Sequence, residues 1–305
     1  MDISDAVDNL FGGVVPERVD EMKAVWNEAD RVRLLNVSRF LLQASYGSIQ
    51  VSEKALRLIW LTGYAAWAAV EAYNVRIVWE RLSGGAFNPA AWNAYTQQQP
   101  LDAEVNRLLE AVGELEAAAT LEDFSWPHNV PKPGEGLQIA DKAKKATFDL
   151  VCMAGAFVFA HELRHALLTR DGDRPARLID EERECDRWAL ALMLDGVPDY
   201  ATATKQDPMA VRIKRILGIL FAQLVILLLT PRHLWEETEE YPAVRARFRA
   251  VLDAAVDPVP EWFWTSVASM LAAFARKLCV LPAPMSFPPT DRDLAYALCD
   301  ALRAA

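Results

Sequence analysis

The strongest constraint on the fold is a helical repeat of apolar residues that recurs along most of the chain. Eight segments carry apolar side chains at intervals of three and four residues, or on nearly all sides, which is typical of α-helices packed on a core. They are residues 17–44, 52–80, 101–119, 140–170, 179–194, 209–229, 243–255 and 261–278. The alternation typical of strands is hard to find. We therefore expect a mainly α fold, α+β at most, with a small edge strand or sheet.

Turn-rich breaks separate these segments, but no flexible linker divides the chain. Residues 124–137, with the sequence FSWPHNVPKPGEGL, are too rich in proline for a helix and predict an extended run or edge strand. We expect an N-terminal helical region over 1–120, a core over 121–255 and a C-terminal helical region over 256–305. The three regions are expected to share one compact body.

Charge and cysteine content limit the partners and compartments that suit the chain. Lys and Arg number 32 against 42 Asp and Glu, so the formal net charge is −10 and a basic surface for nucleic acid is not expected. Four scattered cysteines without CxxC spacing favour neither a disulfide framework nor a cysteine-based zinc site. The acidic first residues, MDISDAVDNLFGG, lack the pattern of a signal peptide. These features predict a cytoplasmic protein without a nucleic-acid partner.

One apolar run raises the question of a membrane span. Residues 216–229 are apolar except for Gln223, and three cationic residues, Arg212, Lys214 and Arg215, come just before them. A span needs about 20 apolar residues, so a run of this length favours a helix buried in a protein core. Membrane association of this run stays open as the alternative.

Two of the four histidines form the pattern HExxH, in which His161 and His165 flank Glu162. Positions four apart on a helix lie about 40° apart on one face, so two imidazoles there can converge on one metal ion. Glu162 lies beside that line, where its carboxylate reaches a water molecule rather than the metal. The apolar run 148–160 predicts a buried helix that delivers these residues to a protected cleft. Two hydrogen-bonded histidines in a structural helix are the alternative.

A zinc site needs a third protein ligand, and the next helical segment offers Glu182 at the centre of its inward face. The intervening residues are enough to finish one helix, turn and return antiparallel. Glu181 is the competing ligand, and an acidic helix surface without metal is the remaining alternative. Asp186, one turn beyond Glu182, is placed to accept the other ring N–H of a ligating histidine, expected to be His161.

These residues resemble the gluzincin metallopeptidases, in which HExxH is followed on a second helix by ExxxD, here Glu182 and Asp186. Residues 182–189, ERECDRWA, resemble a stretch of the CAAX-protease and HtpX-like families. The closer similarity is to the Lit-type phage-exclusion peptidases of bacteria, and it covers residues 120–200. It includes WPHNVP at 126–131, AFVFAHELRH at 156–165 and ECDRWA at 184–189.

The resemblance implies a zinc-dependent endopeptidase with a zincin-like core in the region 121–255. It implies His161, His165 and Glu182 as zinc ligands and Glu162 as the general base. Lit-type proteins are associated with cutting translation elongation factor Tu during phage infection, as an abortive defence. This resemblance therefore implies a protein substrate, with elongation factor Tu as the candidate. The sequence does not indicate the oligomeric state.

The sequence departs from the membrane-type relatives after the second helix, where Tyr241 stands before Pro242 in place of a histidine. As a phenol, Tyr241 could donate a hydrogen bond to the reaction oxyanion, or it could simply begin a helix before Pro242. His233 is the alternative donor. Arg245 and Arg247 fit either an anchor for substrate or the exposed surface of a helix.

Two other functions stay open beside a cytoplasmic endopeptidase. One is a zinc-binding regulatory or sensor protein that turns over no substrate. The other is a membrane-associated processing protease that uses residues 216–229. For an endopeptidase, we expect an extended substrate to pair with residues 124–130 by strand addition.

Overall fold

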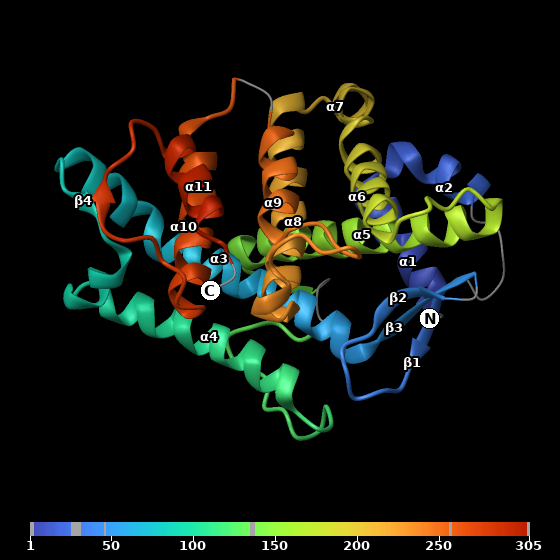
Figure 1. Ribbon diagram of the computed structural model, residues 1–305, viewed down its shortest axis with the longest axis horizontal. Helices are drawn as coiled ribbons and strands as arrows, with labels where there is room; N and C mark the ends of the chain where they lie inside the picture. The colour runs from blue at the N-terminus through green and yellow to red at the C-terminus, as the bar shows by residue number, and fades with distance from the viewer. Residues whose placement is uncertain (1–2, 26–31, 46, 135–137, 256–257, 304–305) are drawn as a thin grey trace.

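Long helices dominate the molecule, and they cross one another in two directions (Figure 1). The computed structural model describes residues 3–25, 32–45, 47–134, 138–255 and 258–303. Helices α3 (Glu53–Leu82) and α5 (Lys142–Asp171) pack against each other, and α8 (Pro208–Leu229) packs on both. Helix α10 (Glu261–Lys277) packs on α3 near its other end. The mainly helical fold expected from the sequence is confirmed.

Shorter helices complete this frame. They are α1 (Ile3–Val14), α2 (Val19–Val25), α4 (Gln99–Ala117), α6 (Leu178–Leu194), α7 (Val197–Thr204), α9 (Val244–Asp253) and α11 (Asp291–Asp300), with 3-10 turns η1 (Pro16–Arg18), η2 (Pro89–Ala94) and η4 (Arg232–Leu234). Helix α6 packs on α5, α9 on α8, α4 on α3, and α11 on α10. Seven of the predicted helical segments, from 52–80 to 261–278, are confirmed with ends shifted by a few residues.

The prediction of a helix over 17–44 is wrong in its second half. Strands β1 (Val32–Leu35), β2 (Leu42–Ser45) and β3 (Ser48–Ser52) form a sheet in the order β1-β3-β2, with β1 parallel and β2 antiparallel to β3. Residues 26–31 lie outside the described part of the chain. The strands have four or five residues each, too few for alternation to stand out against a helical repeat.

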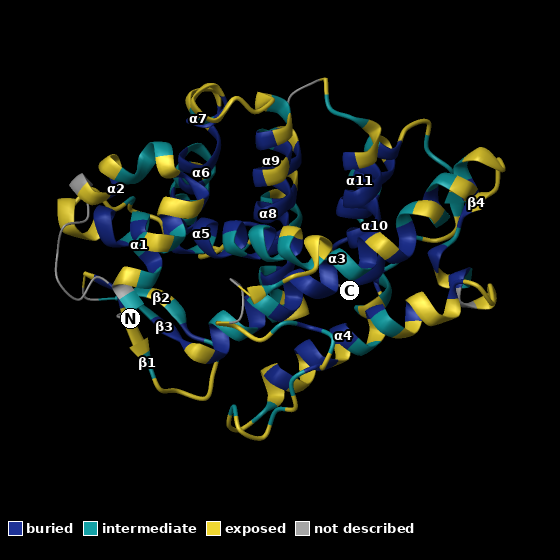
Figure 2. Ribbon diagram, turned by 180° about the vertical axis from the view of Figure 1, so that it is seen from behind, coloured by how far each residue is buried: buried dark blue, intermediate teal, exposed yellow. Residues whose placement is uncertain are grey.

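One large hydrophobic core connects the two ends of the described chain, beside a small separate cluster of Val197, Ala201 and Val211. It includes Val7 near the N-terminus and Leu302 near the C-terminus, together with residues of every long helix. Figure 2 shows α8 and α10 buried over most of their length. A short ladder of β4 (Ala86–Phe87) with β5 (Met285–Ser286) pairs segments far apart in the sequence. The region boundaries at 120 and 255 stay a prediction.

The apolar run 216–229 forms most of α8, whose residues are largely covered by neighbouring helices; Ile216, Ile219 and Ala222 have no exposed surface. One helix in the described part of the chain, α5, is long and apolar enough to cross a membrane by length and composition alone. Of its most apolar window, 61% is buried inside the protein, which is what the core helix of a folded domain also shows.

Candidate metal centre

Helix α5 places the HExxH residues where α6 and the sheet meet it (Figure 1). The helix begins at a cap in which the Asp141 carboxylate accepts hydrogen bonds from the next backbone N–H groups. It ends at Gly172, whose φ of 74° is left-handed and favours glycine, and the chain then turns back into α6. His161 has only 8% of its surface exposed. The buried helix expected from the sequence therefore delivers these side chains.

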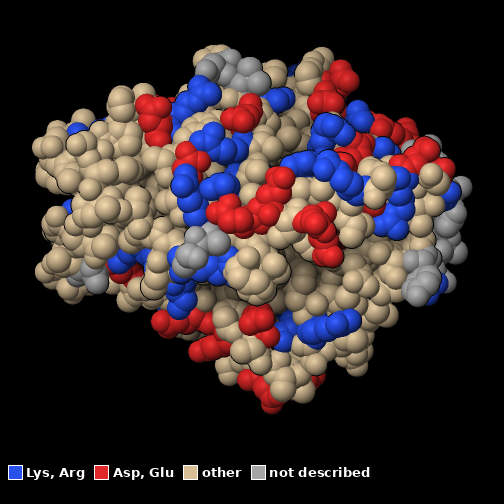
Figure 3. Space-filling model, in the orientation of Figure 1, with Lys and Arg blue, Asp and Glu red and all other residues tan. Residues whose placement is uncertain are grey.

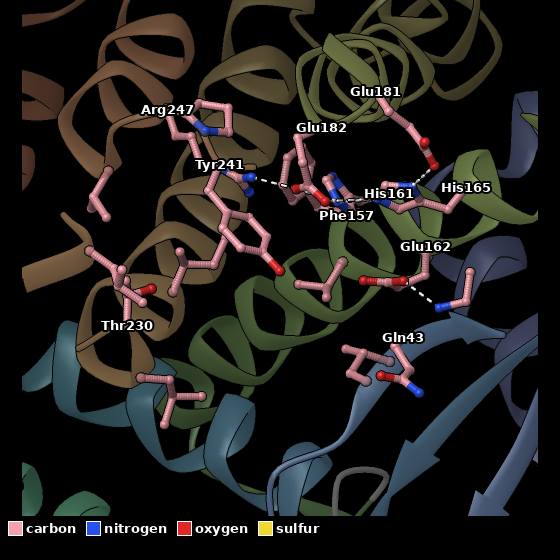
Figure 4. A pocket seen from close by; sticks show the side chains of 18 of the residues that line it. Gln43, Phe157, His161, Glu162, His165, Glu181, Glu182, Thr230, Tyr241 and Arg247 are labelled. Atoms are coloured by element: carbon pink, nitrogen blue, oxygen red, sulfur yellow. Dashed lines mark hydrogen bonds and ion pairs between the residues drawn. The ribbon is translucent and has the colours of Figure 1, made fainter. Parts of the chain in front are cut away.

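The imidazoles of His161 and His165 converge with the Glu182 carboxylate from α6 (Figure 4). The two Nε2 atoms lie 3.1 Å apart. Glu182 Oε2 lies 3.5 Å from His161 Nε2, and Glu182 Oε1 lies 3.3 Å from His165 Nε2. One ligand atom from each residue falls within 4.8 Å of the other two. Two imidazole nitrogens and one carboxylate oxygen are the donor set of open zinc sites, so the residues present fit a metal ion.

A separate carboxylate of α6 holds the other nitrogen of each imidazole. Asp186 Oδ1 lies 3.0 Å from His161 Nδ1, and Glu181 Oε1 lies 2.7 Å from His165 Nδ1. These contacts fix both rings with Nε2 toward Glu182. Glu181, the competitor for the third ligand position, is thus turned to the outer side of His165. There its second oxygen accepts from Arg174 Nε at 2.9 Å.

Arg247 of α9 is a member of the site that the sequence left undecided. Its guanidinium donates to Glu182 Oε2 at 2.6 Å and lies 3.3 Å from Asp186, and only 9% of the side chain is exposed. Arg245, the other candidate, pairs instead with Glu236 at 2.8 Å. The helical step of about 100° per residue turns Arg245 and Arg247 to opposite faces of α9, but sequence alone does not say which face meets α6.

Proximity of acids and imidazoles shifts their pKa values in opposite directions. Burial disfavours the imidazolium of His161, yet hydrogen bonds to Asp186 and Glu182 outweigh burial and raise its pKa. The pKa of His165 is raised in the same way, by Glu182 and Glu181. Burial would raise the pKa of Glu182, but both imidazoles hold it well below its usual range. A metal ion therefore competes with protons for these nitrogens.

Glu162 stands beside the ligand cluster and contacts the sheet rather than α6 (Figure 4). Its Oε2 accepts a hydrogen bond from the backbone N–H of Ala44 at 2.6 Å. Burial raises the pKa of Glu162, and the neighbouring His161 and His165 offset part of this effect. A carboxylate with a raised pKa next to a metal site is suited to accepting and returning a proton.

The strand at the site is β2, not the proline-rich segment. Residues 124–134 form turns and irregular chain, so of the two predictions for this segment the edge strand is wrong within these residues; 135–137 lie outside the described part of the chain. Three prolines each remove a backbone donor, and Trp126 Nε1 bonds within the segment to Val130 O. β2 pairs on one side with β3, and its opposite edge faces the cavity, where Ala44 donates to Glu162.

Tyr241 lies on the opposite wall of the same cavity, which has a volume of about 600 Å³. The residue is 47% exposed, and its hydroxyl points into the cavity (Figure 4). The backbone N–H of Tyr241 donates to Thr238 Oγ1 at 2.9 Å, and this turn holds the residue before Pro242. His233, the alternative donor, is exposed and is not part of the cavity wall. Around the site, acidic and basic side chains are interspersed over α6 and its neighbours (Figure 3).

Two histidines and a glutamate on packed helices, with a second glutamate beside them, define a site of the HExxH type. The sequence model of the peptidase U49 family matches residues 49–265, which is 217 of the 305 residues. The chain belongs to this family, the Lit peptidases, and is a peptidase. No curated protein and no solved structure matches the chain. The resemblance stated from the sequence is confirmed, and its match extends beyond residues 120–200 on both sides.

Proposed function

We propose that this peptidase is a zinc-dependent endopeptidase. The observation that supports it is the orientation of the two imidazoles, each held at Nδ1 by an acid of α6 while Nε2 faces Glu182. Two neutral imidazoles and one carboxylate would leave a formal charge of +1 on a bound zinc ion. Zinc bound there would supply a Lewis acid that acidifies water and polarises the scissile carbonyl.

In this proposal Glu162 is the general base and Tyr241 is the hydrogen-bond donor to the oxyanion. Glu162 takes a proton from the attacking water and returns it to the departing amine. Its Oε2 is held by Ala44, which fixes the carboxylate next to the imidazoles. Tyr241 donates from its phenol to the oxygen that becomes negative when the carbonyl is attacked. Its exposed ring and its position across the cavity from Glu162 support this role.

An extended segment of the substrate pairs with the free edge of β2. Ala44 pairs across the antiparallel ladder with Ile49, yet its N–H points away from β3 into the cavity. Glu162 occupies that N–H, but in the described part of the chain no strand lies beyond this edge of β2, and such an edge can add a further strand; Gln43 and Ala44 both line the cavity. This arrangement suits a protein substrate with an exposed or loosened segment.

The proposed substrate is translation elongation factor Tu, cut in the bacterial cytoplasm as a defence against phage. The similarity to Lit-type peptidases across the HExxH and ECDRWA blocks supports this choice, as does membership of the family. The composition is compatible with a reducing compartment, since Cys152, Cys185, Cys279 and Cys299 are all free.

Substitution of the general base tests the proposal. Glu162→Gln should lower cleavage of purified elongation factor Tu by about a hundredfold or more, because a positioned base contributes at least that factor. Its zinc content should equal that of the wild type, since Glu162 is not among the three ligand residues. Glu184→Gln is the matched control, because this acid pairs with Arg164 outside the cavity.

Three results would contradict parts of the proposal. Full activity of Glu162→Gln would show that Glu162 is not the general base. Loss of zinc in that variant would show that Glu162 is a metal ligand. If the wild type cuts unfolded casein but not elongation factor Tu, the proposed mechanism stands but the proposed substrate is wrong.

A further inference from the structure

A second cavity adjoins the metal centre and has no part in the proposed reaction. Its volume is about 350 Å³, within the range of sites for small molecules. It shares Phe157, Pro242 and Arg247 with the wall of the active-site cavity. Leu190 and Val251 add aliphatic surface from α6 and α9. The two cavities therefore lie on either side of a common wall.

Gln223 gives this cavity a deeply buried polar group, in addition to the charged side chains of Asp186 and Arg247 in its wall. It is the one polar residue in the run 216–229, it lines the cavity, and only 1% of it is exposed. Within the described part of the chain, its Oε1 has no hydrogen-bond partner. A buried amide oxygen without a partner costs about 1–3 kcal/mol, so a leucine here would be the more stable choice. The glutamine thus points to a ligand.

The cavity is open to solvent on the side where Arg183 and Arg187 line it, but most of its accessible wall is apolar. Water against that wall is readily displaced by an apolar group, because a water molecule needs two to four polar partners. An engineered apolar cavity of about 150 Å³ already binds benzene. A cavity of about 350 Å³ can therefore hold a substituted aromatic ring or a branched aliphatic group.

We propose that this cavity binds a small apolar molecule with one hydrogen-bonding group, which pairs with the amide of Gln223. The same ligand would lie against Arg247 and Asp186, which also line the cavity. These two residues contact Glu182 and His161 on the side of the metal centre. An occupant is thus placed one side chain away from two of the proposed metal ligands, and its binding does not depend on the proposed reaction.

Two fluorinated probes of similar size test the assignment by ¹⁹F NMR titration of the full chain. The hydroxyl of 4-fluorophenol both donates and accepts, so it satisfies the Gln223 amide in either orientation, whereas 4-fluorotoluene has no such group. We expect both probes to bind the wild type at millimolar concentration or below. In Gln223→Leu, the ratio of the 4-fluorotoluene Kd to the 4-fluorophenol Kd should fall about fivefold, because the variant loses one hydrogen bond.

Further variants separate this cavity from the active site. Ala250→Trp should fill the second cavity and abolish binding of both probes, whereas Glu162→Gln should leave both Kd values unchanged, since Glu162 lines the active-site cavity and not the second one. If Gln223→Leu does not fold, Gln223→Met makes the same comparison with a longer apolar chain. Failure of both probes to bind the wild type, or an unchanged Kd ratio in the Gln223 variants, would overturn the proposal.

Discussion

Glu181, Glu182 and Asp186 stand close together on α6, yet each carboxylate has a different partner at the metal centre. Glu182 faces the Nε2 atoms of both histidines. Glu181 contacts Nδ1 of His165 and Asp186 contacts Nδ1 of His161, on the sides of the rings away from Glu182. The helical step of about 100° per residue separates the first two onto different sides of the helix. That step was enough to prefer Glu182 as the ligand from sequence, but it did not reveal that Glu181 would contact His165.

Arg247 compensates this acidic cluster, and its removal should destabilise the metal-free protein. Arg247→Ala leaves the half-buried Glu182 and Asp186 without their guanidinium partner, so we expect a loss of about 2 kcal/mol in the free energy of unfolding. Zinc should restore part of this loss, because the bound ion supplies the missing positive charge. Urea titrations with a chelator and with zinc measure both effects.

Arg245→Ala is the control for this prediction. Arg245 and Glu236 are 32% and 41% exposed, so their ion pair should contribute less than about 1 kcal/mol. Equal losses in the two variants, or a loss in Arg247→Ala that zinc does not reduce, would show that Arg247 does not balance the acids of the metal centre.

Among the elements, a small strand or sheet was expected, but its position at residues 32–52 was missed. Ile49 and Val51 are β-branched and buried, as a strand requires, but the flanking run 32–45 carries apolar residues at helical and strand intervals alike. The missing strand mattered for function, because β2 is the element that reaches Glu162.

Proline in place of Ala44 tests the function of the β2 edge. Ala44→Pro removes the N–H that donates to Glu162 on the edge where the proposed substrate pairs, while the hydrogen bonds of β2 to β3 come from neighbouring residues. We expect kcat/KM for a protein substrate to fall about fivefold or more. Ala44→Val keeps the N–H, so its kcat/KM should stay near that of the wild type. Equal kcat/KM values for the two variants would show that the edge of β2 does not bind the substrate.

The contact of α8 with α5 depends on a glycine. A Cβ atom at Gly218 would lie 2.3 Å from Met153 Cβ and 3.1 Å from the Leu150 carbonyl oxygen, so the two helices would have to move apart. We expect Gly218→Ala to lower the free energy of unfolding by about 1–3 kcal/mol, measured by urea titration.

Gly113 in α4 provides the matched control for that helix contact. A Cβ atom there meets nothing within 4 Å, so Gly113→Ala should stabilise the protein by about 0.5–1 kcal/mol through helix propensity. A Gly218→Ala variant as stable as Gly113→Ala would mean that α8 and α5 do not pack as closely as described.

For the whole molecule, local patterns were sufficient for the helices and for the convergence of three side chains. Seven helical segments and the pair of α5 with α6 follow from helical periodicity, and the spacing of His161, His165 and Glu182 brings these residues together. What the sequence could not supply are contacts between elements far apart along the chain. Ala44 with Glu162, and Arg247 with Glu182, join segments 118 and 65 residues apart, and no periodicity records such distances.

The central claim is that one zinc ion is held by His161, His165 and Glu182. Zinc content per chain, measured by mass spectrometry after dialysis against a weak chelator, tests it most directly. We predict one zinc per chain in the wild type and in Glu184→Ala, and almost none in His161→Ala or Glu182→Ala. Full zinc content in Glu182→Ala, with the variant folded, would contradict the claim.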